Sequence, residues 1–309
     1  MHNYNLLDDK TIQLPCGVFA GVESYTCFPS GALEGIRLSE KNMLVTHVGE
    51  LVPAFTDNHR RKNKYSVEFY ASGMVKAVYL EEQQEITTPI GEFPAELVTF
   101  FESGKLKRFF PLDGKISGLW SEEEEKSLAI PLHFELPFTK FTAIISAIAF
   151  YQSGDIRSLT LFPGEVINIT TKYGEIEARH GFSLYETGEI ETMEPSMPVE
   201  ISTPIGVISA YDPEAHAVNA DINSLGFNKE GSVIALTTKR NRVTAKTADG
   251  RLLVFSPFEI VNPLDDESFI TVGLKISFDY NLRTVNFLCG KELTELPLES
   301  CEFSLEDCM

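Results

Sequence analysis

The sequence is short of positive charge. It has 26 Lys and Arg residues against 45 Asp and Glu residues, a net charge of -19 at pH 7. Because affinity for phosphate groups depends on many cationic contacts, this balance opposes nucleic acids and anionic membranes as partners. No stretch reaches the roughly 18 consecutive apolar residues of a membrane span, and the first ten residues, MHNYNLLDDK, lack the basic and apolar segments of a secretory signal. We therefore expect a cytoplasmic protein.

Motifs for metal, cofactor or nucleophilic chemistry are also missing. The five cysteines are odd in number and form no CxxC pair, which favours reduced thiols. The sequence contains no P-loop, GxSxG or dinucleotide fingerprint. The histidines stand singly, at His2, His47, His59, His133, His180 and His216. We expect no cofactor and no metal, and the sequence favours a protein without enzymatic activity, although missing motifs do not exclude an enzyme.

What the sequence does contain is a repeated phrase, exemplified by FYASGMVKAVYL at residues 69 to 80. Its copies share an aromatic residue three places before a glycine, a polar or small residue just before it, and an aliphatic residue two places after it. Alternating apolar positions around a Ser-Gly or Thr-Gly pair predict two half-buried strands joined by a turn with positive φ. The copies are centred on Gly31, Gly73, Gly104, Gly154, Gly188 and, in a weaker form, Gly231. We call them phrase hairpins, and we expect their aromatic residues, such as Tyr70, Phe101, Tyr151 and Tyr185, to form the core rather than a ligand site.

A second phrase follows most copies after 18 to 20 residues. Examples are ITTPIGEF, with its turn at Gly91, and ITTKYGEI, with its turn at Gly174. β-Branched residues before the turn and an aliphatic residue after it again predict strand, turn, strand. Further copies end at Gly49, Gly206 and, in VTAKTADGRLL, at Gly250. The module is therefore predicted to consist of two hairpins, a phrase hairpin and a second hairpin.

The modules recur every 31 to 50 residues, and their length varies at one point, between the second hairpin and the next phrase hairpin. The insertions there are PAFTDNHRRKNKYS (53–66), SEEEEKSLAIPLHFELPFTKFTAI (121–144) and SAYDPEAHAVNADINS (209–224). Insertions at one point of a repeated unit should emerge on a common face, which makes these segments the first candidates for specificity. The third module departs from the pattern, since its second turn would be KISGLW. We expect a single domain, 1–309, with the alternative of two halves, 1–120 and 144–309, joined by an inserted segment, 121–143.

The phrases FYASGMVKAVYL, FFESGKLKRF and FYQSGDIRSL resemble MORN-type repeats of the divergent bacterial variety, over about residues 24–253. The ordinary MORN unit is shorter and carries a glycine before its first strand that most copies here lack. The resemblance implies consecutive antiparallel hairpins in an elongated twisted sheet or solenoid, and a role as a scaffold or binding surface. The family has no catalytic residues to transfer to this chain. The expected fold class is all-β, and the alternative is a six-bladed β-propeller, because four short strands also fit one blade.

Two groups of charged residues are candidate sites. The basic island HRRKNK and the acidic run SEEEEK are candidates for binding a partner, and they are also candidates for binding each other within the chain. Their candidate residues are His59, Arg60, Arg61, Lys62, Glu122 and Glu123. Ser121 is a candidate N-cap for a short helix. The turn residues Glu50, Glu92 and Glu175 would form an acidic column if the modules stack in register.

The sequence favours a non-catalytic interaction or scaffold protein whose partner is another protein. The alternative is a carbohydrate-active or other hydrolytic enzyme that uses a pair of carboxylates such as Glu92 and Glu175. In the scaffold interpretation, excising residues 57–64 should weaken partner binding without unfolding the protein. The sequence does not indicate the oligomeric state or the identity of the partner.

Overall fold

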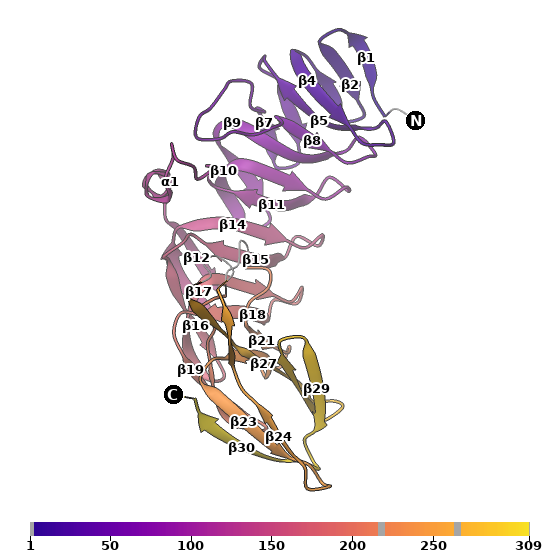
Figure 1. Cartoon of the computed structure of the whole chain (residues 1–309). Helices are drawn as coiled ribbons and strands as arrows, with labels where there is room; N and C mark the ends of the chain where they lie inside the picture. Colours follow the sequence, from indigo (N-terminus) through magenta and orange to yellow (C-terminus); the bar gives the residue numbers. More distant parts are fainter. Residues whose placement is uncertain (1–2, 216–219, 263–266, 309) are drawn as a thin grey trace. The chain divides into compact units, whose positions relative to one another are not determined.

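A computed structural model describes residues 3–215, 220–262 and 267–308, and within them the chain is nearly all β, as the sequence predicts (Figure 1). It divides into two compact units. Unit 1 comprises residues 1–131 and 144–157, and unit 2 comprises residues 132–143 and 158–309. Every strand pair between named strands in the described residues is antiparallel.

Unit 1 contains β1 (Asn5–Asp8), β2 (Thr11–Leu14), β3 (Gly17–Phe19), β4 (Val22–Cys27), β5 (Leu33–Leu38), β6 (Leu44–Thr46), β7 (Gly49–Leu51), β8 (Val67–Phe69), β9 (Val75–Thr88), β10 (Gly91–Phe100), β11 (Leu106–Phe110), α1 (Glu122–Leu128) and β14 (Ile145–Phe150). Its main sheet has the strand order β4-β5-β8-β9-β10-β11-β14. β15 (Ile156–Leu161) begins in unit 1 and ends in unit 2.

Unit 2 contains β12 (Leu132–Leu136), β13 (Thr139–Ala143), β16 (Val166–Thr171), β17 (Gly174–Leu184), β18 (Ile190–Pro195), β19 (Val199–Thr203), β20 (Gly206–Ala210), β21 (Leu225–Phe227), β22 (Val233–Thr238), β23 (Asn241–Lys246), β24 (Leu252–Phe255), β25 (Phe258–Val261), β26 (Phe269–Val272), β27 (Leu274–Asp279), β28 (Thr284–Cys289), β29 (Glu292–Pro297) and β30 (Glu302–Asp307). Its main sheet has the order β15-β17-β18-β21-β22-β27-β28-β29.

The six phrases fold in the same way. In each, the backbone N–H three places before the glycine donates to the carbonyl one place after it, and the glycine N–H donates back, as in Tyr70–Met74 and Gly73–Tyr70, both at 2.8 Å. All six glycines have positive φ, which explains why the phrase needs glycine there. The predicted phrase hairpins are confirmed. Because they pair side by side into one continuous sheet within each unit, the separate four-stranded blades of the propeller alternative are absent from the described residues.

A row of apolar residues crosses each main sheet, with one residue per strand from β5 to β14 in unit 1 and from β15 to β28 in unit 2. In the phrase hairpins its members stand six places before and five places after the glycine, except that the residue six before Gly31 is the exposed Tyr25, and β27 and β28 add one residue each. Neighbours in the row are paired across strands, and none is more than 2% exposed. In unit 1 the row is Ile36, Val67, Val78, Val98, Phe109 and Ile148, and in unit 2 it is Leu159, Phe182, Met193, Leu225, Leu236, Ile276 and Phe287. The second hairpins cover this face, and we call the opposite face of each main sheet the open face.

The aromatic residues that the sequence assigned to the core are not the buried ones. They lie one position closer to the glycine than the buried residues do. Tyr70, Phe101, Tyr151 and Tyr185 are half-buried at the turns. Tyr70 and Tyr185 donate from their hydroxyls to the carbonyls of Phe100 and Phe227, at 2.8 Å each. In five of the six copies the buried residue is the one four places before the glycine, such as Phe69 at 0% exposed, whereas the first copy has the exposed Cys27 there. For Tyr70 and Tyr185 the hydroxyl explains the half-buried position, because a tyrosine at the turn can keep its polar end in a hydrogen bond.

The second hairpins close through two-residue loops. The second hairpin of the third module lies at a different place in the sequence from the one predicted. The pairs Thr46–Gly49, Thr88–Gly91, Thr171–Gly174 and Thr203–Gly206 flank such loops, as does Leu136–Thr139. The missing second hairpin of the third module is therefore β12–β13, with the loop Pro137–Phe138, and KISGLW was the wrong assignment. Phe138 O accepts from Thr170 N just as Val48 O accepts from Thr87 N at the corresponding positions. Residues 132–143 of the predicted joining segment thus belong to a module.

The predicted hairpin around Gly250 is β23–β24, which lies outside the main sheet as β6–β7 and β19–β20 do, but its turn is of another kind. Its turn has the bonds of a phrase hairpin, from Thr247 N to Arg251 O and from Gly250 N to Thr247 O. In addition, β27 and β28 form a seventh hairpin in the main sheet, which lacks a glycine. Its turn ends at Arg283, whose φ is +55°. The predicted N-cap and helix are confirmed, because Ser121 and Glu124 form a capping box on α1.

The phrase turn depends on glycine for its backbone and not for space. Gly104 has φ +84°, and a Cβ there would meet nothing closer than Met74 at 3.9 Å. We expect Gly104→Ala to lower the free energy of unfolding by about 1–2 kcal/mol, the cost of a left-handed non-glycine residue. Urea denaturation followed by circular dichroism measures this. Gly118→Ala is the control, because Gly118 has no positive φ and open space around it, and an equal loss in both variants would contradict the interpretation.

Candidate functional site

The insertions lie over the open faces, and the two units differ in what the insertion leaves accessible. In unit 1, residues 53–66 cover the face. The ring of Tyr65 lies where a Cβ of Gly35 would be, at 2.7 Å, which explains the glycine in that strand. Arg37, which points to the open face, donates to the carbonyl of Asn63 at 3.1 Å. The insertion is therefore packed onto the sheet.

Arg60 fastens this cover through a buried cluster of charges. Its guanidinium donates to both carboxylate oxygens of Glu125, at 2.9 and 3.0 Å, and to Glu96. The side chains of Arg60, Glu96 and Glu125 are 11%, 6% and 6% exposed. Burial opposes the charge on Arg60, but the hydrogen bonds to Glu125 and Glu96 outweigh it and raise the pKa of the guanidinium. The basic island and the acidic run thus bind each other within the chain, one of the two possibilities that the sequence left open.

Other polar groups of this cluster also have partners within the unit, whereas the Nε of Arg61 is buried without a hydrogen-bond partner. Glu125 accepts from the backbone of Gly114 at 2.8 Å and from the indole of Trp120 at 2.6 Å. Glu96 accepts from the backbone of Asp113 at 2.8 Å. Arg61 donates to the carbonyl of Leu80 at 2.8 Å. The cluster therefore stabilises the fold of unit 1, and its hydrogen bonds are made to groups within that unit.

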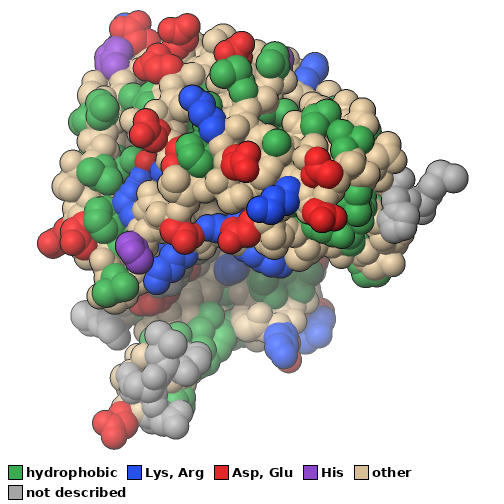
Figure 2. Space-filling view, turned by 90° about the horizontal axis from the view of Figure 1, so that it is seen from above, with side chains coloured by type: hydrophobic (Ala, Val, Ile, Leu, Met, Phe, Trp, Pro, Cys, Tyr) green, Lys and Arg blue, Asp and Glu red, His purple; other side chains and the backbone are tan. Residues whose placement is uncertain are grey.

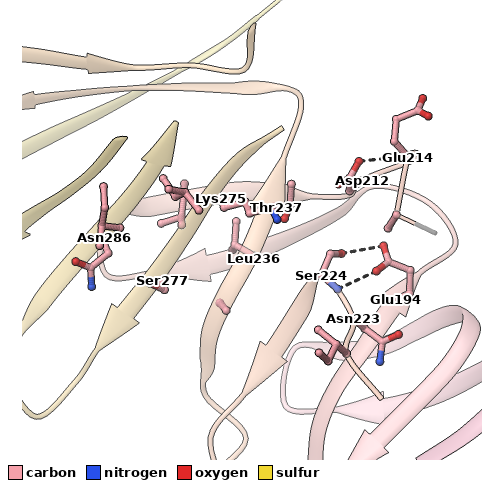
Figure 3. A pocket seen from close by; sticks show the side chains of 16 residues that line it. Glu194, Asp212, Glu214, Asn223, Ser224, Leu236, Thr237, Lys275, Ser277 and Asn286 are labelled. Atoms are coloured by element: carbon pink, nitrogen blue, oxygen red, sulfur yellow. Dashed lines mark hydrogen bonds between the residues drawn. The ribbon is translucent and has the colours of Figure 1, made fainter. Parts of the chain in front are cut away.

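In unit 2 the open face is hollowed (Figure 3). The hollow has a volume of about 470 Å³ and is lined by β18, β22, β27, β28 and β29 together with the insertion, which contributes Asp212, Glu214, Ala215, Ile222, Asn223 and Ser224. Its floor consists of small residues such as Ala235 and Ser277, which are paired across β22 and β27. We call it the open-face hollow. Residues 216–219 of the insertion, including His216, lie outside the described residues, as does His2.

Glu194 is the buried charged group of the hollow, at 1% exposed. Its two carboxylate oxygens accept from the backbone N–H and the hydroxyl of Ser224, each at 2.8 Å (Figure 3). Arg179 lies 3.9 Å away, too far for a direct hydrogen bond. Burial raises the pKa of Glu194, although the bonds from Ser224 and the charge of Arg179 act in the opposite direction. Glu194 therefore holds one end of the insertion in place and also presents an ionisable carboxyl group.

The other end of the insertion is held by two cations. Lys239 lies 3.3 Å from the carboxylate of Asp212, and Arg179 donates to the backbone carbonyl of Asp212 at 2.7 Å. The guanidinium of Arg179 also lies over the ring of Tyr211, 5.4 Å from its centroid. Fixed at both ends, the described part of the insertion forms a wall of the hollow.

The opposite side of the hollow mixes apolar and polar side chains. Leu288 and Leu293 lie on β28 and β29, and Leu293 is 68% exposed. Lys275 on β27 and Asn286 on β28 also line the hollow (Figure 3). The hollow therefore combines an acidic wall, a floor of small residues and an apolar rim with one lysine. Such a lining suits a partner with both apolar and polar groups.

The predicted site residues are divided by the structure. Arg60 and Arg61 point inward, whereas His59, Lys62, Glu122 and Glu123 are exposed. Of the acidic column, Glu50 and Glu92 belong to unit 1 and Glu175 to unit 2, and all three are exposed. Around the N-terminal end of the chain, acidic and basic side chains are interspersed on the face shown in Figure 2. The hollow was missed, although its insertion was a predicted candidate for specificity.

No family model, curated protein or solved structure matches this chain. Among the described residues, no group of three or more His, Cys, Asp and Glu side chains is arranged to hold a metal ion. No helix there has the length and apolar character needed to cross a membrane. The geometry of the two open faces is therefore the basis for a functional proposal.

The expectation that residues 57–64 can be removed without unfolding is not compatible with this cluster, because excision would leave Glu96 and Glu125 buried without a cation. The sharper variant is Arg60→Met. We expect it to lower the free energy of unfolding of unit 1 by about 3–5 kcal/mol, the usual cost of an uncompensated buried charge.

Guanidinium denaturation of Arg60→Met measures this loss, and Lys62→Met is the matched control. Lys62 is exposed two residues away, so its substitution should stay within about 0.5 kcal/mol of the wild type. Adding Glu96→Gln and Glu125→Gln to Arg60→Met should restore part of the stability. Similar stability of Arg60→Met and Lys62→Met would show that the cluster does not fasten the insertion.

The raised pKa of Glu194 predicts a pH dependence of stability. Stability from such a group is fully present below the ordinary pKa of 4.5 and is lost as the pH rises through the higher folded value. As the pH rises above 4.5 we therefore expect the wild type to lose stability relative to Glu194→Gln, which carries no charge. Denaturant titrations at a series of pH values measure the difference. Glu186→Gln, at an exposed turn, should show a constant difference; a constant difference for Glu194→Gln as well would contradict the burial effect.

Proposed function

We propose that this protein is a non-catalytic interaction protein, and that the open-face hollow of unit 2 takes a segment of another protein. One observation carries the proposal. Insertions at the same point of the module satisfy their charges internally and cover the sheet in unit 1, but wall an open hollow of about 470 Å³ in unit 2. A frame that closes one face and leaves the other accessible is suited to binding.

The chemistry of the hollow supports a polypeptide as the partner. Apolar side chains at Leu288, Leu293 and Ile222 offer contacts to apolar residues, and the last of these is 80% exposed. Asn286, Lys275 and the acidic wall offer hydrogen bonds to backbone and polar groups. Large exposed apolar side chains beside polar ones are typical of protein interaction surfaces. A scaffold role also agrees with the resemblance to MORN-type repeats, which stays a prediction, as do the cytoplasmic location and the absence of nucleic-acid and membrane partners.

A hydrolytic enzyme is the second candidate, and one observation favours it. Glu194 is a buried carboxyl with a raised pKa, in a hollow that also contains Asp212 and Glu214. A carboxyl of this kind can serve as a general acid. The pair named from the sequence, Glu92 and Glu175, does not support this function, because both are exposed and they belong to different units. Hydrolysis of a panel of nitrophenyl glycosides that disappears in Glu194→Gln would favour the enzyme.

The interaction proposal is tested by filling the hollow. Ser277→Trp places an indole over the small-residue floor, and we expect it to abolish capture of the proteins that the wild-type chain retains by cross-linking from a lysate of its own source. Mass spectrometry of the cross-linked species measures the loss. Arg242→Trp is the control, because Arg242 is an exposed strand residue of β23 that does not line the hollow.

Both variants must keep the circular dichroism spectrum of the wild type. Loss of capture in Ser277→Trp and retention in Arg242→Trp is the expected result. Equal capture by all three proteins would contradict the hollow as the binding site. Retained capture in Ser277→Trp combined with loss in His59→Ala or Lys62→Ala would instead assign binding to the exposed part of the basic island.

A further inference from the structure

A second kind of cavity lies at the edge where the turns meet. In unit 1 the two-residue turns lie against phrase turns further along the chain. The first of these two-residue turns is Pro15–Cys16, between β2 and β3, and the others belong to the second hairpins. Pro15 packs on Gly73, 3.1 Å from the position of a Cβ, and Pro89 packs on Gly154 at 3.4 Å. Proline fills this space because its ring is compact and fixed in direction.

His47 takes the place of the proline in the second turn of the first module, and there the space is not filled. The phrase turn it reaches is that of Gly104, and no atom of His47 comes within 4 Å of a Cβ built there. A pocket of about 460 Å³ remains, which we call the turn pocket. Its apolar lining includes Leu44, Val75 and Phe100, each at most 8% exposed. The volume and the apolar lining are those of a small-molecule site.

Among the polar side chains that line the turn pocket, Lys105 carries the single charge. His47 accepts the backbone N–H of Leu106 at its Nε2 atom, 3.2 Å away, so the ring is neutral in this arrangement. Burial raises the pKa of the Cys16 thiol to about 11, so it stays uncharged. Lys105 also lines the pocket, and its ammonium group donates one hydrogen bond, to the carbonyl of Gln152 at 2.8 Å. No carboxylate belongs to the described lining.

Unit 2 contains the corresponding pocket and provides an internal comparison. Lys172 occupies the place of His47, and the pocket it lines has a volume of about 490 Å³. Tyr173 accepts the backbone N–H of Val233, the counterpart of Leu106, at 3.1 Å. Here, however, the lining contains Lys172 and Lys229 together with Glu189 and Glu230, so the charges balance. The same geometry thus occurs once with a net positive charge and once without.

We propose that the turn pocket of unit 1 binds a small apolar carboxylic acid, with its hydrocarbon part against Leu44, Val75 and Phe100 and its carboxylate at Lys105. The apolar lining excludes a fully polar anion, because burying its polar groups without partners is costly. Lys105 is the only lysine, arginine, aspartate or glutamate of the lining, so the local charge favours an anion at this point even though the net charge of the chain is -19. This site is independent of the open-face hollow and of the proposed interaction.

The test uses the full chain and two probes, the fluorescent apolar anion 8-anilinonaphthalene-1-sulfonate and decanoate. We expect the wild type to bind one anilinonaphthalene sulfonate at the turn pocket, displaced by decanoate and not by the uncharged 1-decanol. His47→Pro, which copies the residue of Pro89, should fill the pocket and abolish this binding. Lys105→Glu should weaken it by about tenfold or more, the factor that corresponds to about 1.4 kcal/mol.

Lys172→Pro is the matched control, since it fills the pocket of unit 2 in the same way and should leave binding unchanged. Circular dichroism and thermal unfolding must show that all variants fold. Unchanged binding in His47→Pro, loss of binding in Lys172→Pro instead, or equal displacement by decanoate and 1-decanol would each overturn the proposal. Unchanged affinity in Lys105→Glu would overturn the part assigned to its charge.

Discussion

The structure depends on one row of apolar contacts in each main sheet. Each strand from β5 to β14 in unit 1 and from β15 to β28 in unit 2 contributes one buried residue, and its neighbours in the row come from the adjacent strands. Because side chains alternate between the faces of a strand, fixing this row also fixes which residues face the second hairpins and which face away. A one-residue slip would bring polar side chains into the core. The row therefore holds the register of the phrase hairpins and defines the open faces.

Once the frame is fixed in this way, the insertions decide what each open face presents. The unit 1 insertion brings two arginines to buried carboxylates, and their polar groups, apart from the Nε of Arg61, find partners inside the unit. The described part of the unit 2 insertion is fixed at its ends, by Asp212 and Ser224, and forms a wall of the hollow above the small-residue floor. Similar insertion points thus produce a fastened cover in one case and the wall of a hollow in the other. We therefore expect partner binding at the open-face hollow of unit 2.

Much of this fold could be predicted from the sequence because its turns are determined by residues that are neighbours in the chain. Ser-Gly and Thr-Gly pairs, β-branched leads and the capping serine each act within a few residues. Signals that depend on more distant contacts were missed. The seventh hairpin has Arg283 where glycine was expected, and the turn Pro137–Phe138 lies behind an insertion. The apolar residues of the core row stand at fixed distances from the glycine in most phrases. The prediction nevertheless placed the aromatic residues of the turns in the core.

The candidate site was less predictable than the fold. Nothing within a few residues of Glu194 distinguishes it from the many other glutamates, because its burial arises from Ser224, thirty residues later, and from the sheet around it. Arg60 and Arg61 looked available for a partner for the same reason, since Glu96 and Glu125 are distant in sequence. The insertions were the correct segments to consider, but which of them is closed depends on pairings that only the folded chain displays.

Hydroxyl-radical footprinting of the protein, free and bound to its cross-linked partner, tests the central claim that binding occurs on the open face of unit 2. The account predicts that Ile222 and Leu293, 80% and 68% exposed in the free chain, lose reactivity in the complex. Leu128, 47% exposed at the end of α1 in unit 1, should remain reactive. Protection of Leu128 with unchanged reactivity at Ile222 and Leu293 would contradict it.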